Sequence, residues 1–350
     1  MTKAQHGSGH LASGAYGCVM YPPAKCDGNA NRKSSSYKHS VGKIFSTVYL
    51  AADEHEKQMV VEKIDPKSHF TLPLLRQCLV KRFTGMDSCK FDKDKDGNSP
   101  DQDAYPQLLY AYGGPDLGSF VDARMDATPS KKFKAFMKLF NSLGPLFKGL
   151  DKLGKAGYAH LDIKPANILY NGKKASLIDF GLMDHKHSIF TSDTLYLLKY
   201  DYPFYPPEFK LYALARASTK PPSFAEFKTT FMKNFAHMRT LPPWSSASVD
   251  KSLKPFYNTI RFQTDGFSEA KLDHEMNTFD DQVDSYSLGM TLHIIYEYLE
   301  LDMVRESELV HVFIERLVEL NPYFRLDVHN AYLEYKRIKK IYAISYGNSK

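Results

Sequence analysis

The 350-residue sequence predicts an α+β protein with a small, β-rich N-terminal part and a larger, α-helical C-terminal part. Short apolar runs interrupted by glycine, such as Leu11–Val19, are typical of antiparallel strands and gather early in the chain. Farther on, apolar residues recur at helical spacing between Lys131 and Gly157. An Asn171-Gly172 pair between two apolar runs predicts a further hairpin at the centre of the chain. Strands followed by helices in this way favour the α+β class.

Composition and charge are those of an ordinary folded protein. Hydrophobic residues make up 43% of the sequence and charged residues 25%, with a formal net charge of +6. That charge is modest for this length, so the sequence does not argue for a specific nucleic-acid partner. The N-terminus lacks the apolar core of a signal peptide, and no apolar run approaches membrane-spanning length. We therefore expect a soluble intracellular protein with no membrane partner.

The cysteines favour a reducing compartment. Cys18, Cys26, Cys78 and Cys89 contain no Cys-x-x-Cys pair that would indicate a metal or redox site. Disulfides are rare in the cytoplasm, so we expect these four side chains to be free thiols.

The first strands surround a glycine-containing turn. Leu11–Val19 predicts strand, tight turn and strand, in which Gly14 and Gly17 let the backbone approach a phosphate without a Cβ in the way. Taken alone, this pattern fits a plain hairpin equally well. Val41–Phe45 predicts the next strand and carries Lys43.

A helix and a last strand complete the first part. The segment 51–64 has helical apolar spacing and includes Glu54 and Glu56. Gln107–Leu117 predicts a strand that runs into a Gly-Gly-Pro turn, so we place the end of the first part at Gly114.

An acidic run between these elements, Asp92–Asn98, echoes the start of a calcium-binding loop. The match fails afterwards, at Ser99, at Pro100 and at Asp103, where a calcium loop has a bidentate glutamate. A solvated insertion is the better interpretation.

The most informative stretch is His160–Tyr170, followed by Leu177–Gly181. An aspartate at 162, a lysine two residues later and an asparagine five residues later form a dense polar group, and Asp179 follows the predicted hairpin. Because the polar residues stand at strand ends, we expect their side chains to lie close together. A polar hairpin that only solvates its charges would not require this order of residue types.

These residues resemble the catalytic loop of protein kinases, His-Arg-Asp-Leu-x-x-x-x-Asn, followed by Asp-Phe-Gly. The resemblance implies that Asp162 accepts the proton of the attacking hydroxyl and that Lys164 neutralises charge on the transferred phosphoryl group. It implies that Asn167 and Asp179 bind Mg²⁺ through oxygen atoms. Asp-x-Lys-Pro is the form found in kinases that modify Ser and Thr.

The same resemblance assigns the nucleotide site. Lys43 would pair with the α- and β-phosphates and with a helix glutamate, for which Glu56 is the first choice and Glu54 the rival. Backbone groups of Tyr110 to Tyr112 would bond the adenine edge, and Asp116 would reach the ribose. The remaining nucleotide-binding positions, from the glycine loop to the hinge, are Ala12, Gly14, Gly17, Val19, Tyr110, Tyr112 and Asp116.

Motifs in the second part extend the resemblance. Tyr205-Pro206-Pro207-Glu208 resembles Ala-Pro-Glu, and Arg325 matches the arginine that pairs with that glutamate. Asp284 resembles the helix aspartate that holds the backbone of the catalytic loop.

The sequence also departs from the kinase pattern. Leu161 replaces the arginine before the catalytic aspartate, and Asp201 stands where Ser/Thr kinases carry a threonine that contacts it. About 75 residues separate Glu208 from Asp284, and a phenylalanine stripe in this insert, about 209–283, is expected to be core rather than a docking site. These features resemble the divergent protein kinases of large DNA viruses.

The resemblance implies a two-lobed, protein-kinase-like fold, with an N-lobe at 1–114 and a C-lobe at 115–350. The expected activity is transfer of the γ-phosphoryl group of ATP, with Mg²⁺, to Ser or Thr of a protein substrate. The expected location is the cytoplasm of a host cell, with packaging in a virion as an alternative. Two other functions stay open: a pseudokinase scaffold and a small-molecule kinase of related fold.

Overall fold

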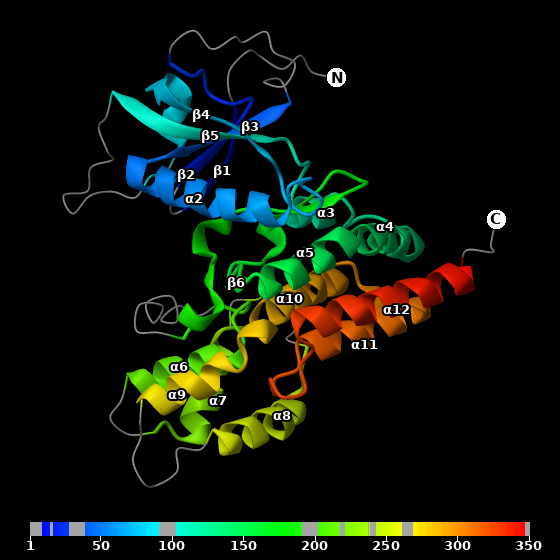
Figure 1. Ribbon diagram of the computed structural model, residues 1–350. Coiled ribbons are helices and arrows are strands. Elements are labelled where there is room, and N and C mark those ends of the chain that lie inside the picture. Colours follow the sequence, from blue (N-terminus) through cyan, green and yellow to red (C-terminus); the bar gives the residue numbers. More distant parts are fainter. Residues whose placement is uncertain are drawn as a thin grey trace. The chain divides into compact units, whose positions relative to one another are not determined.

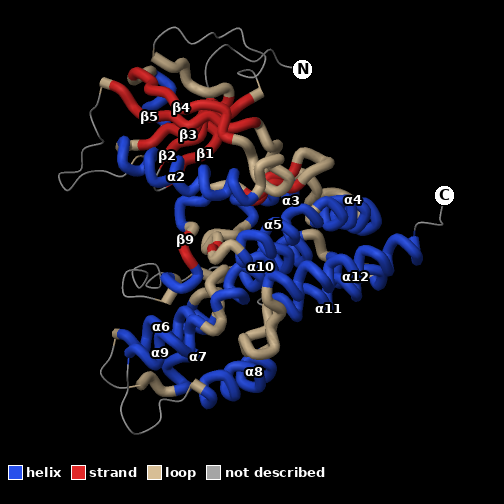
Figure 2. The backbone as a smooth tube through the Cα atoms, viewed as in Figure 1, coloured by secondary structure: helices blue, strands red, loops and turns tan. Residues whose placement is uncertain are grey.

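The computed structural model describes residues 9–14, 17–27, 39–89, 91, 103–190, 202–217, 221–236, 238, 243–260 and 269–346. The chain divides into two units. Unit 1 comprises residues 1–114 together with 179–181, and unit 2 comprises 115–178 and 182–350. The predicted α+β class is confirmed, since a β-sheet dominates unit 1 and helices dominate unit 2 (Figure 2). Within the described ranges, no helix is both long and apolar enough to cross a membrane.

Unit 1 is built on a five-stranded antiparallel sheet in the order β1-β2-β3-β5-β4. Helix α2, Val48–Ile64, lies along this sheet in Figure 1 and begins at an N-cap, Thr47, whose side chain accepts a hydrogen bond from the backbone N–H of Leu50. The helix begins three residues before the predicted segment because of this cap. The strands are β1 Gly9–Gly14, β2 Gly17–Tyr21, β3 Ser40–Phe45, β4 Leu74–Lys81 and β5 Ala104–Ala111, and a short 3₁₀ helix covers Thr84–Ser88.

The predicted free thiols are wrong, because all four cysteines form disulfides within unit 1. Cys18 pairs with Cys89 and Cys26 with Cys78, across sequence separations of 71 and 52 residues. Folding of the sheet brings the members of each pair together, since each disulfide has one cysteine on a strand of the sheet. These are Cys18 on β2 and Cys78 on β4. Cys18 and Cys89 are buried in one apolar cluster with Met20, Ile44 and other side chains. The acidic run Asp92–Asn98 lies outside the described residues.

Unit 2 is mainly helical (Figure 1). The helical spacing between Lys131 and Gly157 corresponds to two helices, because Gly144 and Pro145 follow Leu143 and proline supplies no N–H to continue the hydrogen-bond ladder. The helices are α3 Leu117–Asp122, α4 Pro129–Ser142, α5 Gly144–Lys155, α6 Pro207–Arg216, α7 Phe224–Lys233, α8 Ser246–Thr259, α9 Glu269–Asn277, α10 Val283–Tyr298, α11 Glu308–Leu317 and α12 Val328–Tyr346.

The predicted central hairpin is present. Strands β7, Ile168–Tyr170, and β8, Ala175–Leu177, pair antiparallel. Asn171 accepts hydrogen bonds from two following backbone N–H groups, and Gly172 has φ of 88°, which explains this choice of turn residues. A second short pair joins β6, Tyr158–Ala159, to β9, Asp184–His185.

The insert forms part of the core of unit 2. Phe227 and Phe231 of α7 are fully buried, and they lie in one apolar cluster with Phe256 of α8 and Tyr286 of α10. The interpretation of the phenylalanine stripe as core is therefore confirmed.

Candidate active site

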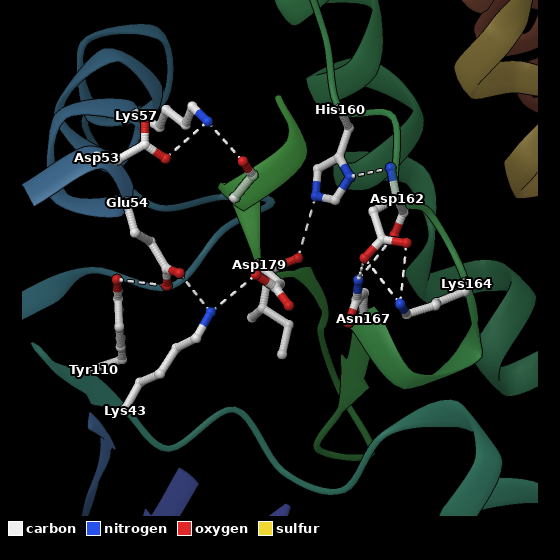
Figure 3. Close-up of polar contacts among 12 residues, drawn as sticks. Lys43, Asp53, Glu54, Lys57, Tyr110, His160, Asp162, Lys164, Asn167 and Asp179 are labelled. Atoms are coloured by element: carbon white, nitrogen blue, oxygen red, sulfur yellow. Dashed lines mark hydrogen bonds and ion pairs between the residues drawn. The ribbon is translucent and has the colours of Figure 1, made fainter. Parts of the chain in front are cut away.

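In unit 1, Lys43 lies between two carboxylates (Figure 3). Its Nζ donates to Glu54 Oε2 at 2.5 Å and to Asp179 Oδ1 at 2.9 Å. β3 supplies the lysine and α2 the glutamate, and Val19 of β2 is the register partner of Lys43. The side chains of Lys43 and Glu54 are 14% and 8% exposed, so this pair is largely removed from water, whereas the Asp179 side chain is 36% exposed.

The prediction that Glu56 pairs with Lys43 is wrong. Glu54 is buried and makes the ion pair, whereas Glu56 is exposed. Helix α2 buries Ala51, Glu54, Gln58 and Val61, which recur at helical spacing. Helical spacing in the sequence puts Glu54 on the same face as Ala51 and Val61, but only the packing of α2 shows that this is the face that is buried.

Burial and charge shift the pKa values in this cluster. Burial alone lowers the pKa of Lys43, but the carboxylates of Asp179 and Glu54 outweigh it and raise the pKa above its ordinary value. Burial raises the pKa of Glu54 despite the opposing effect of Lys43. Tyr110, whose hydroxyl donates to Glu54 Oε1 at 3.4 Å, has a raised pKa because of burial and the nearby negative charge of Glu54. The ammonium group of Lys43 is thus the group in this cluster whose charge is hardest to remove by titration.

Asp179 adopts a left-handed backbone conformation, with φ of 65°. A non-glycine residue there stores strain that neighbouring contacts must hold. One such contact is made by Lys57, whose Nζ donates to the carbonyl of Gly181 at 2.6 Å and to Asp53 at 2.9 Å. Lys57 could not be identified from the sequence, because nothing near it in the chain marks its contact with the Asp-Phe-Gly segment.

The other predicted nucleotide-binding residues have identifiable surroundings. A Cβ on Gly17 would lie 2.8 Å from the carbonyl oxygen of Ile44, so β2 and β3 approach here as only glycine allows. Ala12 and Gly14 lie on the β1 backbone. Tyr112 stacks on Tyr21 with ring centroids 4.8 Å apart.

Backbone and side-chain groups near the predicted hinge already have partners. The N–H of Tyr112 donates to the carbonyl of His39 at 2.9 Å. Both carboxylate oxygens of Asp116 accept bonds from Ser119, from its N–H at 2.8 Å and its hydroxyl at 3.2 Å, and so cap α3. Their roles at adenine and ribose stay predictions.

In unit 2, the Asp162 carboxylate is held within its own loop. Lys164 Nζ donates to both carboxylate oxygens, at 3.0 and 2.9 Å, and Asn167 Nδ2 donates to Oδ2 and to the Asp162 carbonyl, each at 2.8 Å. Figure 3 shows the three side chains pointing toward one another. Asp162 and Asn167 are buried. The structure therefore brings this predicted trio together and leaves the amide oxygen of Asn167 as its remaining metal-ligand atom.

The preceding backbone is strained and anchored. Leu161 has φ of 65°, unusual for a bulky side chain, and is buried. Asp284 of α10 accepts the N–H of His160 at 2.7 Å and that of Leu161 at 3.1 Å, as the sequence predicts. His160 Nδ1 accepts from the N–H of Asp162, so its Nε2 is the atom that donates to the carbonyl of Ile178. Together these bonds hold the loop that presents Asp162.

One contact to Asp162 was missed by the sequence analysis. The Tyr202 hydroxyl donates to Asp162 Oδ1 at 2.7 Å. Asp201, the position singled out from the sequence, lies outside the described residues. The tyrosine at the next position could have indicated this contact, since its side chain ends in a hydroxyl, as does the threonine that Ser/Thr kinases carry at the position of Asp201.

The predicted ion pair between Glu208 and Arg325 is present. Two bonds, of 2.5 and 3.0 Å, join the side chains, and both are completely buried. The Arg325 guanidinium also lies 5.0 Å from the ring centroid of Tyr286. This contact joins the start of α6 to the segment between α11 and α12.

The two residues predicted to bind Mg²⁺, Asn167 and Asp179, both carry oxygen donors. Within the described ranges, no group of three or more His, Cys, Asp or Glu side chains gathers as a metal site. Mg²⁺ accepts one or two protein oxygens and completes its shell with water and phosphate. Taken separately, the amide oxygen of Asn167 in unit 2 and the carboxylate of Asp179 in unit 1 are donors of that kind.

No model of a known protein family matches the sequence. The chain is 38% identical over 72 residues to the human Cell division cycle 7-related protein kinase, a match that covers 17% of this chain and 12% of that kinase. It is 29% identical over 154 residues to the mouse protein of the same name, covering 39% of this chain and 23% of that kinase. The chain therefore matches less than a quarter of either kinase. These partial similarities suggest a relationship to the protein kinase superfamily.

Proposed function

We propose that this chain is a serine/threonine protein kinase that transfers the γ-phosphoryl group of MgATP to protein hydroxyls. The observation that carries the proposal is the Asp162 carboxylate, bonded by Lys164 and Asn167 within one short loop. Transfer to a hydroxyl needs an oriented proton acceptor beside a cation that neutralises phosphoryl charge. Asp162 would be that acceptor and Lys164 that cation.

Lys43 would bind the α- and β-phosphates of ATP. Its position between Glu54 and Asp179 supports this role, because the two carboxylates keep the ammonium charged and oriented. Asn167 and Asp179 would hold Mg²⁺, which when bound neutralises phosphate charge and orients the phosphates. Val19, Tyr110 and Tyr112 stay candidates for contacts with the nucleotide.

Serine/threonine specificity rests on Asp162-Ile163-Lys164-Pro165, the form of the loop found in kinases of that class. We also propose, from the replaced arginine at Leu161 and the long insert, kinship with protein kinases of large DNA viruses. A protein hydroxyl is the proposed acceptor in either case.

The test is transfer of radiolabelled γ-phosphate from ATP to a generic protein acceptor, with MgCl₂ or with EDTA. We expect Mg²⁺-dependent label on Ser and Thr of the acceptor, and a loss of about 10²-fold or more in turnover for Asp162→Asn. Asp151→Asn is the matched control, because Asp151 pairs with Lys155 and His329 on α5 and α12 rather than with the catalytic loop. ATP binding without transfer would favour a pseudokinase, and transfer to a small molecule alone would favour the related small-molecule kinases.

A further inference from the structure

The Asp162 carboxylate is bonded from two parts of the chain. Lys164 and Asn167 belong to its own loop and lie two and five residues away. Tyr202 lies 40 residues away, beyond the Asp179–Gly181 segment, and its hydroxyl makes the 2.7 Å bond to Oδ1. Tyr202 is thus a third donor, and it ties the side chain of Asp162 to a segment outside the loop.

The tyrosine ring is held firmly enough to serve as a fixed donor. Its centroid lies 4.7 Å from that of Tyr205, edge to face, and 5.2 Å from that of Phe204. Tyr205 in turn stacks on Phe209 of α6, with centroids 5.0 Å apart. The hydroxyl position is thus set by packing against the core of unit 2, so little rotamer freedom is lost when the bond forms.

Charge adds to this arrangement. Lys164 Nζ lies 5.9 Å from the centroid of the Tyr202 ring, within reach of a cation–π attraction. The same ammonium bonds Asp162, so Tyr202 contacts both members of the Asp162–Lys164 pair. A hydrogen bond to a carboxylate is stronger than one between neutral groups.

We propose that Tyr202 is a positioning residue, which orients the Asp162 carboxylate toward the incoming substrate hydroxyl. This inference rests on the proposed kinase function. Within the loop, Lys164 bonds both carboxylate oxygens of Asp162, and Asn167 bonds Oδ2 and the carbonyl. Tyr202 adds a second bond to Oδ1 from outside the loop. The productive orientation of the base then depends on correct placement of the chain around Tyr202, which follows residues 191–201.

Tyr202→Phe removes only the hydroxyl and keeps the packed ring. We expect kcat on the protein acceptor to fall about tenfold or more, equivalent to about 1.4 kcal/mol of activation free energy per factor of ten. The KM for ATP and the melting temperature should stay near those of the wild type, because the ring contacts remain. Tyr205→Phe is the matched control, since it alters a neighbouring tyrosine of the same aromatic cluster and should leave kcat nearly unchanged.

A second variant separates positioning from general structural support. If Tyr202 acts through Asp162, adding Tyr202→Phe to Asp162→Asn should lower the residual turnover by less than about twofold. An unchanged kcat for Tyr202→Phe would overturn the inference while wild-type transfer left the kinase proposal standing. A rise in kcat/KM would also overturn it, because the phenol would then be competing with the substrate hydroxyl. If the wild type transfers no phosphoryl group, the kinase proposal fails and this role falls with it.

Discussion

At the scale of single residues, the site depends on charged side chains that are held in place by their hydrogen-bond partners. Lys43 has two carboxylate neighbours, and Asp162 has donors on both of its oxygens. Leu161 and Asp179 hold left-handed backbone conformations in the two segments that carry the polar residues. Strain of this kind persists where surrounding bonds over-determine the backbone, as Asp284 does for Leu161.

Replacement of Glu54 should separate the true partner of Lys43 from its neighbour on the helix. We expect Glu54→Gln to lower kcat/KM at least tenfold, because Lys43 loses the carboxylate that orients it at 2.5 Å. Glu56→Gln, on the exposed face of the same helix, should retain wild-type kinetics. Equal losses in the two variants, measured by steady-state kinetics, would contradict the assignment of Glu54.

The pKa of Glu54 also predicts a pH dependence of stability. Because burial raises this pKa above 4.5, the folded protein binds the proton more tightly than the unfolded chain does. The resulting stabilisation is complete below pH 4.5 and is lost as the pH rises through the folded pKa. The melting temperature of the wild type minus that of Glu54→Gln should therefore decrease as the pH rises from 4.5. A difference that increases over this range would show that the pKa is lowered instead.

At the scale of elements, the ends of helices are joined by buried polar contacts. Asp284 near the start of α10 holds the loop that carries Asp162, and Glu208 near the start of α6 pairs with Arg325. Since Glu208 and Arg325 are completely buried, neither charge can be compensated by water when the other is removed.

Arg325→Met should destabilise the protein by about 3–5 kcal/mol, because it leaves the Glu208 carboxylate buried and unpaired. The double variant Glu208→Leu/Arg325→Met should recover most of this loss, since apolar side chains then fill the space without a charge. Urea denaturation of the three proteins measures the free energies of unfolding. A double variant as unstable as Arg325→Met would mean that the pair itself, rather than the lone charge, decides stability.

At the scale of the whole molecule, each unit has its own means of holding the residues of the proposed site. Unit 1 combines its sheet with two disulfides, and unit 2 surrounds the loop that carries Asp162 with a large helical core. Metal and nucleotide should add to the stability of the folded chain by mass action.

The two disulfides make a prediction about the oxidised protein. Without reductant, a thiol-alkylating reagent should modify none of the four cysteines, and peptide mapping should recover the Cys18–Cys89 and Cys26–Cys78 pairs. Removing Cys26–Cys78 by a double alanine substitution should cost about 2–4 kcal/mol, because the unfolded chain regains the freedom of the closed loop. Four modified cysteines in the untreated, folded protein would contradict the pairing.

Ligand-induced stabilisation tests the proposed metal ligand. ATP with MgCl₂ should raise the melting temperature of the wild type, by an amount equivalent to about 2.7 kcal/mol when ATP is at 100 times its Kd. Asp179→Asn should abolish the Mg²⁺-dependent part of this rise. Its melting temperature without ligand should stay close to that of the wild type, because Lys43 keeps its bond to Glu54. An unchanged rise in MgCl₂ would remove Asp179 from the metal site.

The amino-acid sequence by itself determined the α+β class, the central hairpin and the pairing of Glu208 with Arg325. Asn171-Gly172 works through the turn preferences of adjacent residues, so the hairpin needs no knowledge of the remaining fold. The Glu208–Arg325 pair was predicted from motifs that resemble those of protein kinases. That resemblance does not depend on how far apart the two residues lie in the chain. The loop around Asp162 was recognisable for the same reason.

Only the tertiary structure decided the partner of Lys43, the state of the cysteines and the contact of Tyr202. Choosing Glu54 over Glu56 required the orientation of α2 against the sheet, since a shift of two residues turns a side chain from the buried face to the exposed one. The disulfides and the Tyr202–Asp162 bond join residues 40 to 71 positions apart. Contacts of that length are created when the core packs, and no local propensity of the residues involved encodes them.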